Sequence, residues 1–201
     1  MGRLVGEFTA TKAPPNVSSD EMMMQSYAAQ GGDASRIVVL HGEVNEPVIA
    51  SIIVQLLQLA SMNSKPIYLI ISTYGGSVDE MFSLYDAIKF LPCPVHTIAL
   101  GKVMSAGVLL LASGVKGQRM IGCSARIMIH PISGIFAGNV FEAINEVDEH
   151  KRLQSLMVNA LLKETKMSRV DIKRIMTAGH DRFLTPDEAI KFGIVDIIIG
   201  G

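Results

Sequence analysis

Short apolar runs alternate three times with segments of helical periodicity in this sequence, and this alternation constrains the fold more than any other feature. The runs are "RIVVL" (36–40), "PIYLIIS" (66–72) and "PVHTIAL" (94–100). In each segment that follows, apolar residues recur three or four positions apart, as they do on one face of a helix. Strands joined by helical crossovers build a mainly parallel sheet. The sequence therefore predicts an α/β fold.

Several local signals predict where helices begin and end. Asn45 is expected to cap the first helix, and Thr185, followed by Pro186 and by Glu188, predicts a capping box that begins a last helix. Gly193 is expected to end that helix before a final strand. Two further runs, "QRMIG" and "ARIMIH", predict short strands, and "TYGGS" predicts a turn.

The chain is expected to divide into residues 1–33 and 34–201. Residues 1–33 show no sustained periodicity, which predicts a flexible or processed arm or loop outside the core. Residues 139–166 contain neither proline nor glycine and predict one long helix. Because such a helix extends beyond a compact domain, we expect another subunit to pack against it.

The composition of the chain favours some classes of partner and argues against others. Hydrophobic residues make up 49% and charged residues 18% of the chain, which favours apolar surface buried between subunits of a homo-oligomer. The formal net charge of -1, without a run of Lys and Arg, argues against nucleic acid as a partner. The longest apolar window, about 95–113, contains His96 and Lys102 and is a poor membrane span.

The cysteines and the first residues of the chain predict the cellular compartment of the protein. Cys93 and Cys123 lack the spacing of metal ligands, so we expect buried free thiols in a reducing compartment and no metal site. The first residues, "MGRLVGEFTATK", lack the basic and then apolar pattern of a secretory signal. The expected location is cytoplasmic.

Ser105 lies in "KVMSAG", shortly after the third predicted strand and at the start of a helix. Binding sites of α/β folds gather at this carboxyl edge of the sheet. A helix cap, a satisfied core hydroxyl and a nucleophile all remain open interpretations of this serine. The backbone N–H groups of Gly76 and Ala106 are candidate donors to an oxyanion, although an ordinary turn also explains the glycine pair at 75–76.

A nucleophilic serine needs a base, and the base needs an acid that orients it. Among five histidines, His130 ends the apolar run "ARIMI" and precedes Pro131, so it emerges from buried structure. Asp181 lies in the predicted loop "AGHDRF", whereas the other aspartates considered are typical of helix starts or solvated surfaces. The nucleophile elbow of α/β-hydrolases is disfavoured, because Val103 occupies a position that this motif gives to glycine.

The order Ser105, His130, Asp181, with the blocks "GGSV", "LYDAI", "MSAG", "LLLASG", "KGQRM", "SARIMIH" and "DRFLTPDEAIKFGIVD", resembles the proteolytic subunits of the Clp peptidase (ClpP) family. The resemblance runs from about residue 36 to the end of the chain. It implies that Ser105 is the nucleophile, His130 the general base and Asp181 the orienting acid. It also implies that the amides of Gly76 and Ala106 form the oxyanion hole.

The same resemblance implies a crotonase/ClpP-like fold of repeated β-β-α units with a projecting handle helix at about 139–166. It further implies heptameric rings stacked in pairs, and an AAA+ Clp-type ATPase that unfolds proteins and feeds them to a serine-type, ATP-dependent endopeptidase. No cofactor is expected in this chain, which has no phosphate-binding GxxxxGK[ST] loop. Four residues fall at or near the family's ATPase-docking cleft, although core packing explains them equally well: Leu56, Tyr68, Phe90 and Ile98.

Departures from the family pattern surround the predicted site. Tyr74 stands where the family has proline, residues 102–104 replace small residues before the serine, and Pro131 removes a backbone N–H after the base. His180 stands where the family has an arginine that helps to lock ring to ring. Because imidazole titrates near neutrality and guanidinium does not, we expect weaker or pH-sensitive ring pairing.

Two other functions compete with the peptidase. One is a catalytically weak or non-catalytic ring subunit of a mixed Clp complex, an alternative that the residues at 74 and 131 keep open. The other is a crotonase-like acyl-CoA enzyme, in which the paired amides would hold a thioester enolate.

Overall fold

The computed structural model describes residues 33–134, 138–177 and 180–200. Contacts divide the chain into two units, Met1–Ser35 and Arg36–Gly201. The arm predicted for residues 1–33 lies, apart from Asp33, outside the described residues. The site and its supporting elements belong to the Arg36–Gly201 unit.

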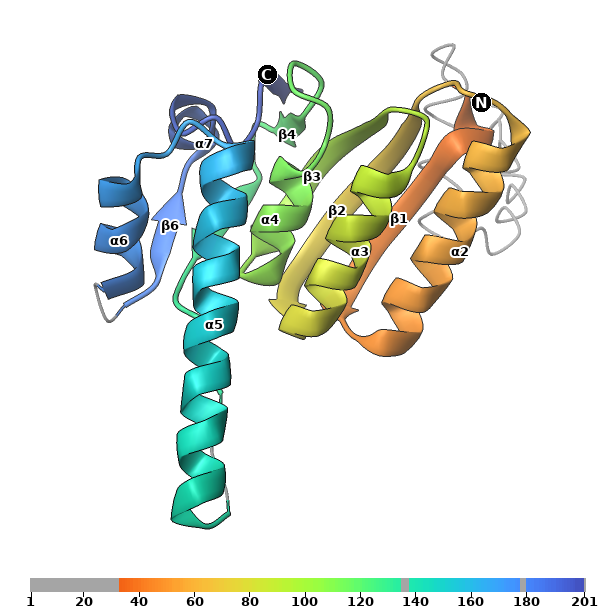
Figure 1. Cartoon of the computed structure of the whole chain (residues 1–201). Coiled ribbons are helices and arrows are strands. Elements are labelled where there is room, and N and C mark those ends of the chain that lie inside the picture. The colour runs from red at the N-terminus through yellow and green to blue at the C-terminus, as the bar shows by residue number, and fades with distance from the viewer. Residues whose placement is uncertain (1–32, 135–137, 178–179, 201) are drawn as a thin grey trace, which may run out of the picture. The chain divides into compact units, whose positions relative to one another are not determined.

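A mainly parallel sheet forms the centre of this unit (Figure 1). Its strands are β1 (Ile37–Val44), β2 (Ile67–Gly76), β3 (Val95–Met104), β4 (Met120–Gly122), β5 (Arg126–Ile129), β6 (Arg182–Leu184) and β7 (Ile197–Ile199). The main order is β1-β2-β3-β4-β7, while β5 pairs with β3 and β6 pairs with β5. Among the described strands only β6 runs antiparallel to its neighbour. The predicted α/β class and mainly parallel sheet are confirmed.

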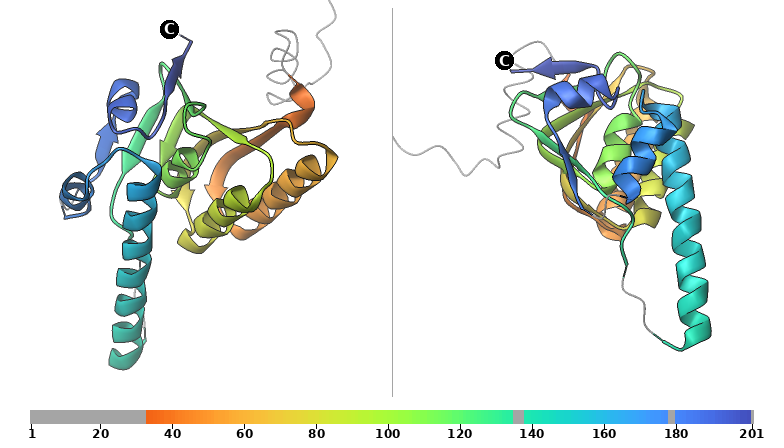
Figure 2. Two further views of the ribbon diagram at one scale, coloured as in Figure 1. Left: turned by 45° about the horizontal axis from the view of Figure 1, so that its top comes forward. Right: turned by 90° about the vertical axis from the view of Figure 1, so that its left-hand side faces the viewer.

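Helices α2 to α5 cover one face of the sheet (Figure 2). The helical elements are η1 (Ala34–Arg36), α2 (Glu46–Met62), α3 (Val78–Phe90), α4 (Ala106–Ala112), α5 (Val140–Glu164), α6 (Arg169–Thr177) and α7 (Pro186–Lys191). Two predicted caps are confirmed: Asn45 accepts from the Val48 N–H, and Thr185 forms a capping box with Glu188. Within the described ranges, no helix is long and apolar enough to cross a membrane.

The core lies between the sheet and these helices. Alternate residues of β2 and β3 point toward the helices, as the period of two along a strand requires. The apolar face of α3 meets them, and four of its residues are buried: Met81, Leu84, Tyr85 and Ile88. Almost every residue of α4 is apolar and buried, so this short helix lies at the centre of the core.

The long helix α5 has two different halves. Asn139 and Glu142 form a capping box at its start. Near that end Val140 and Phe141 are 71% and 80% exposed, whereas Leu161, near the other end, is 1% exposed. Figure 1 shows the first half extending beyond the sheet. This unit alone therefore covers only the second half of α5.

Three details differ from the sequence prediction. The segment "TYGGS" was expected to turn, but β2 continues through Gly76, because Glu43 and Val44 of β1 still pair with Gly75 and Gly76. Part of the predicted loop "AGHDRF" forms β6, since pairing with β5 orders it. Cys123 is exposed rather than buried, and its Sγ donates to the Gly200 carbonyl, whereas Cys93 is buried as predicted.

Candidate active site

Ser105 connects β3 to α4 in a strained backbone conformation. Its φ is 54°, and among the described residues it is the only non-glycine with a positive φ. Such strain costs about 1–3 kcal/mol and persists only where the surroundings impose it. Here the Ser105 N–H donates to the Met128 carbonyl at 2.8 Å, which fixes the turn against β5. Within the described part of the chain, the Ser105 side chain makes no capping hydrogen bond to α4.

The Ser105 hydroxyl instead contacts His130. The distance between Oγ and Nε2 is 2.8 Å, and both residues are half-buried. The two side chains meet because β3 and β5 are parallel neighbours that pair Met104 with Met128. Ser105 directly follows β3, and His130 directly follows β5. This distance allows transfer of the hydroxyl proton to the imidazole.

Gly75 and Gly76 bring the end of β2 against Ser105. A Cβ on Gly75, at φ +102°, would lie 2.7 Å from the Ser105 Cβ, and a Cβ on Gly76 would collide with the Val44 carbonyl oxygen. The next N–H along the chain, that of Ser77, donates to the same Val44 oxygen at 2.8 Å. Gly76 itself lines a small pocket together with Ser105 and His130, so its N–H remains a candidate donor there.

Ala106 is the first residue of α4. The first four N–H groups of a helix have no acceptor within the helix. The Ala106 N–H, adjacent to the Ser105 hydroxyl in the chain, is therefore a second donor on this side of the sheet. Ala106 and Gly76 both line a small pocket of about 50 Å³ beside Ser105 and His130. Apolar side chains form much of the remaining wall: Val78, Met81, Ile132 and Met157.

Asp181 is exposed and lies directly before β6. In the antiparallel register of β5 and β6, Ile129 pairs with Arg182, and one further step would set His130 opposite Asp181. Residues opposite each other in such a pair have Cβ atoms about 4.5–5.5 Å apart. No hydrogen bond joins His130 to Asp181 among the described residues, which exclude 178–179. The structure thus brings two of the three predicted residues into contact, and the third lies one residue beyond the last β5–β6 pair.

One supporting residue escaped the sequence analysis. Gln154 of α5 accepts a hydrogen bond from the Ile132 N–H through Oε1, at 2.8 Å. This bond holds the segment after His130 against α5, while the Gln154 Nε2 is buried without a partner within the described residues. The only sequence signal for Gln154 is its place on a helix, and that does not indicate which strand it meets.

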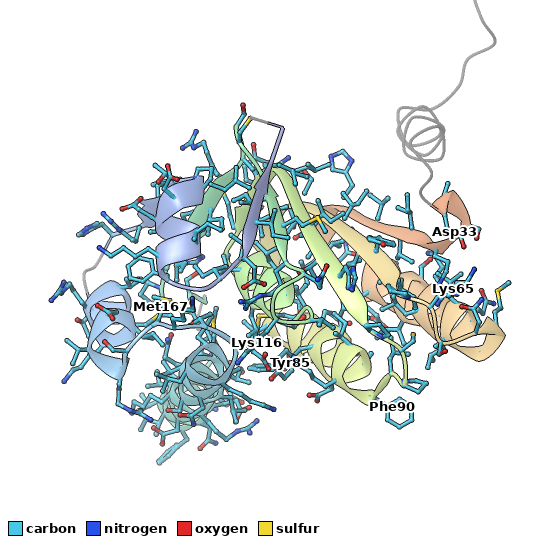
Figure 3. All side chains as sticks on the ribbon, turned by 90° about the horizontal axis from the view of Figure 1, so that it is seen from above. Asp33, Lys65, Tyr85, Phe90, Lys116 and Met167 are labelled. Carbon is cyan, nitrogen blue, oxygen red and sulfur yellow. The ribbon has the colours of Figure 1, made fainter. Side chains whose placement is uncertain are left out.

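The candidate docking residues differ in exposure. Leu56 is completely buried in the core, and Tyr68 and Ile98 are half-buried on the sheet. Phe90 is 79% exposed and points outward from the end of α3 (Figure 3). His180 is exposed and lines a cavity of about 340 Å³ with Asp171, Arg174, Ile175, Arg182 and Phe192.

Comparison with known proteins shows which family the chain belongs to. A family model described as "Clp protease" matches residues 21–201, which is most of the chain. The chain belongs to the Clp protease family. The resemblance inferred from the sequence is thereby confirmed, and the α/β architecture with its long helix agrees with the Clp protease fold.

Curated relatives agree with this assignment. The "ATP-dependent Clp protease proteolytic subunit 1" of Borreliella burgdorferi is 34% identical over 165 residues, which cover 82% of this chain and 84% of the relative. A proteolytic subunit of the same protease from Borreliella afzelii is 34% identical, and one from Borrelia garinii subsp. bavariensis is 33% identical, over the same share of this chain. These matches cover 83% of the length of the Borreliella afzelii relative and 84% of the length of the Borrelia garinii relative.

Within residues 33–134, 138–177 and 180–200, no group of three or more His, Cys, Asp or Glu side chains could hold a metal ion. The candidate site itself presents the Ser105 hydroxyl and the His130 imidazole beside a small pocket.

Proposed function

We propose that this chain is a serine endopeptidase subunit that hydrolyses peptide bonds by acyl transfer. The observation that carries the proposal is the 2.8 Å hydrogen bond between the Ser105 Oγ and the His130 Nε2. A hydroxyl becomes nucleophilic at neutral pH when an adjacent base removes its proton. The strained turn at Ser105 supports the proposal, because strain of this kind clusters at sites of chemistry.

The proposed reaction has two stages. The His130 Nε2 takes the proton as the Ser105 Oγ attacks the peptide carbonyl, and the imidazolium then protonates the leaving amine. Water, activated by the same imidazole, hydrolyses the acyl-enzyme. The Gly76 and Ala106 N–H groups are proposed to hold the oxyanion, and Asp181 is proposed to orient the imidazole through Nδ1.

We also propose that the subunits form heptameric rings stacked in pairs and fed by an AAA+ unfoldase. The relatives named above are proteolytic subunits of an ATP-dependent protease, which supports a separate ATPase partner. The exposed apolar residues on the first half of α5 are suited to contact between subunits. We propose that the cavity lined by His180 takes part in ring pairing, and that Tyr68, Phe90 and Ile98 contribute to ATPase docking.

Labelling with a fluorophosphonate probe, followed by mass spectrometry, tests the chemistry. We expect one adduct at Ser105, none in Ser105→Ala, and normal labelling in Ser113→Ala, a control serine whose Oγ donates to the Leu110 carbonyl. A correctly assembled wild-type protein that takes no label and cleaves no peptide would refute the peptidase and favour the non-catalytic ring subunit.

A further inference from the structure

Four exposed or half-buried side chains cross one face of the sheet next to the candidate active site. They form the cation–aromatic row: Tyr74 on β2, Lys102 on β3, Arg126 on β5 and Phe183 on β6. An adjacent residue on each strand is at most 2% exposed and faces the helices: Thr73, Val103, Ile127 and Leu184. Because side chains alternate between the faces of a strand, the row lies on the face opposite the helices.

Each cation of the row lies over an aromatic ring. The Lys102 Nζ is 4.6 Å from the centre of the Tyr74 ring, and the Arg126 Cζ is 5.1 Å from the centre of the Phe183 ring. These distances are typical of cation–π contacts. The two rings, at the outer ends of the row, thus hold the two cations at its centre.

The two cations are also direct neighbours. Lys102 and Arg126 are register partners of the parallel β3–β5 pair. Like charges at opposed positions of a sheet repel each other. No ion pair in the described part of the chain includes either side chain. The row therefore presents two adjacent positive charges that no carboxylate of the described residues neutralises there.

The row borders the candidate site. Tyr74 directly precedes the glycine pair, Lys102 lies three residues before Ser105, and Arg126 lies four residues before His130. An extended chain spans about 3.3–3.6 Å per residue, so the cations lie within about 10–14 Å of the reacting groups along their strands. An extended substrate with its scissile carbonyl at Ser105 covers that distance with three or four residues.

We propose that the cation–aromatic row binds a carboxylate side chain of the substrate polypeptide, a few residues from the scissile bond. The inference rests on the proposed peptidase function and adds a substrate class to it, namely unfolded segments that carry Asp or Glu at one fixed distance from the cleaved bond. A guanidinium beside an ammonium offers several charge-assisted donors to one carboxylate. Cations held over aromatic rings lose less side-chain entropy on binding. The row lies on the strands that lead to Ser105 and His130, three and four residues before them, and this position favours the substrate over a second copy as the source of that carboxylate.

Positional peptide substrates test the inference on the assembled full chain. Each peptide of the series carries Asp or Asn at one position, from four residues before to four residues after the cleaved bond, and kcat/KM is measured in low and high salt. We expect an Asp-to-Asn ratio of about 3- to 10-fold at one position, reduced by salt. The ratio should fall to about one in Lys102→Gln/Arg126→Gln. It should be unchanged in Lys65→Gln, a control that removes an exposed lysine just before the amino end of β2.

The outcomes separate the inference from the proposed function. The inference is overturned if the Asp-to-Asn ratio is one or less at every position, or if the preference for Asp survives the double substitution. In either case, cleavage of the peptides would still support the proposed peptidase function. Native mass spectrometry of the double variant adds a second readout: loss of the assembly would make the row a contact between subunits and would also overturn the inference. Absence of all cleavage, together with absence of a fluorophosphonate adduct at Ser105, refutes both proposals.

Discussion

The two edges of the parallel sheet use polar side chains in opposite ways. At the amino edge, Arg36 precedes β1 and Arg119 precedes β4, and each is only 2% exposed. Arg36 donates to the carbonyls of Leu59, Lys65 and Pro66. At the carboxyl edge, the Ser105 hydroxyl meets an imidazole across a strained turn. At the amino edge, buried arginines donate hydrogen bonds to acceptors of the protein. At the carboxyl edge, the Ser105 hydroxyl and the His130 imidazole lie beside a pocket.

Arg119 shows how completely the amino edge is paired. Its guanidinium donates to both carboxylate oxygens of Asp196, at 2.8 and 2.7 Å, and to the Glu164 carbonyl at 2.7 Å. Asp196 also accepts from the Gly117 N–H. A buried charge without such partners would destabilise the fold by several kcal/mol. The difference between the edges indicates that one holds the fold together while the other is arranged for chemistry, and substitutions can separate these roles.

Ser105→Ala should have the largest effect on catalysis. It removes the proposed nucleophile, so we expect peptide hydrolysis to fall by about 10⁴-fold or more. The strained backbone remains and only one half-buried hydroxyl is lost, so the melting temperature should change little. Hydrolysis assays and thermal melts on the same preparation measure both quantities. Substantial remaining hydrolysis would show that the carboxyl edge does not act through Ser105.

Gly76→Ala should damage both activity and folding at the carboxyl edge. The new methyl group would collide with the Val44 carbonyl oxygen, so β2 must shift and move the proposed oxyanion donor. Loss of one such donor lowers turnover by about 10²–10³-fold. Gly42→Ala is the matched control, because Gly42 also has a positive φ, +101°, but open space around the position of a Cβ. Equal losses of kcat in the two variants would mean that backbone strain alone, and not the donor, is responsible.

Asp196→Asn should act on stability and leave the chemistry intact. The substitution leaves the Arg119 guanidinium buried without its carboxylate. We therefore expect the free energy of unfolding to fall by about 3 kcal/mol. The turnover per folded subunit should stay near that of the wild type, because Arg119 precedes β4 at the far edge of the sheet. Urea unfolding and active-site titration measure the two quantities. A fall in turnover per labelled serine would show that the amino edge also contributes to catalysis, so that the two edges do not have separate roles.

Local features of the fold were predictable, and contacts between distant segments were not. The caps at Asn45 and Thr185 depend on residues three positions away, so the sequence alone indicated them. His130 could be placed at a strand end because the apolar run "ARIMI" ends there, and Ser105 could be placed between the third apolar run and the helical segment that follows it. The positive φ of Ser105 and the short strand β6 both depend on β5 as a neighbour. The pairing of Arg119 with Asp196 spans 77 residues, and no periodic pattern marks such a pair.

The pH dependence of stability should show the smallest of these effects, and it tests the amino edge alone. Burial by itself would raise the pKa of the Asp196 carboxyl, but hydrogen bonds from Arg119 and Gly117 outweigh burial and hold this pKa below its usual range. A carboxyl with a lowered pKa in the folded state stabilises the fold fully above its unfolded pKa, about 4, and loses that contribution as the pH falls through the folded value. The difference in unfolding free energy between wild type and Asp196→Asn should therefore be constant from pH 7 to about pH 5 and shrink below about pH 4. Protonated Asp and Asn have similar shape and neither carries charge, so the two proteins should converge in acid. Urea midpoints at several pH values measure this, and a difference that stays constant down to pH 3 would show that the Arg119–Asp196 charges do not stabilise the amino edge.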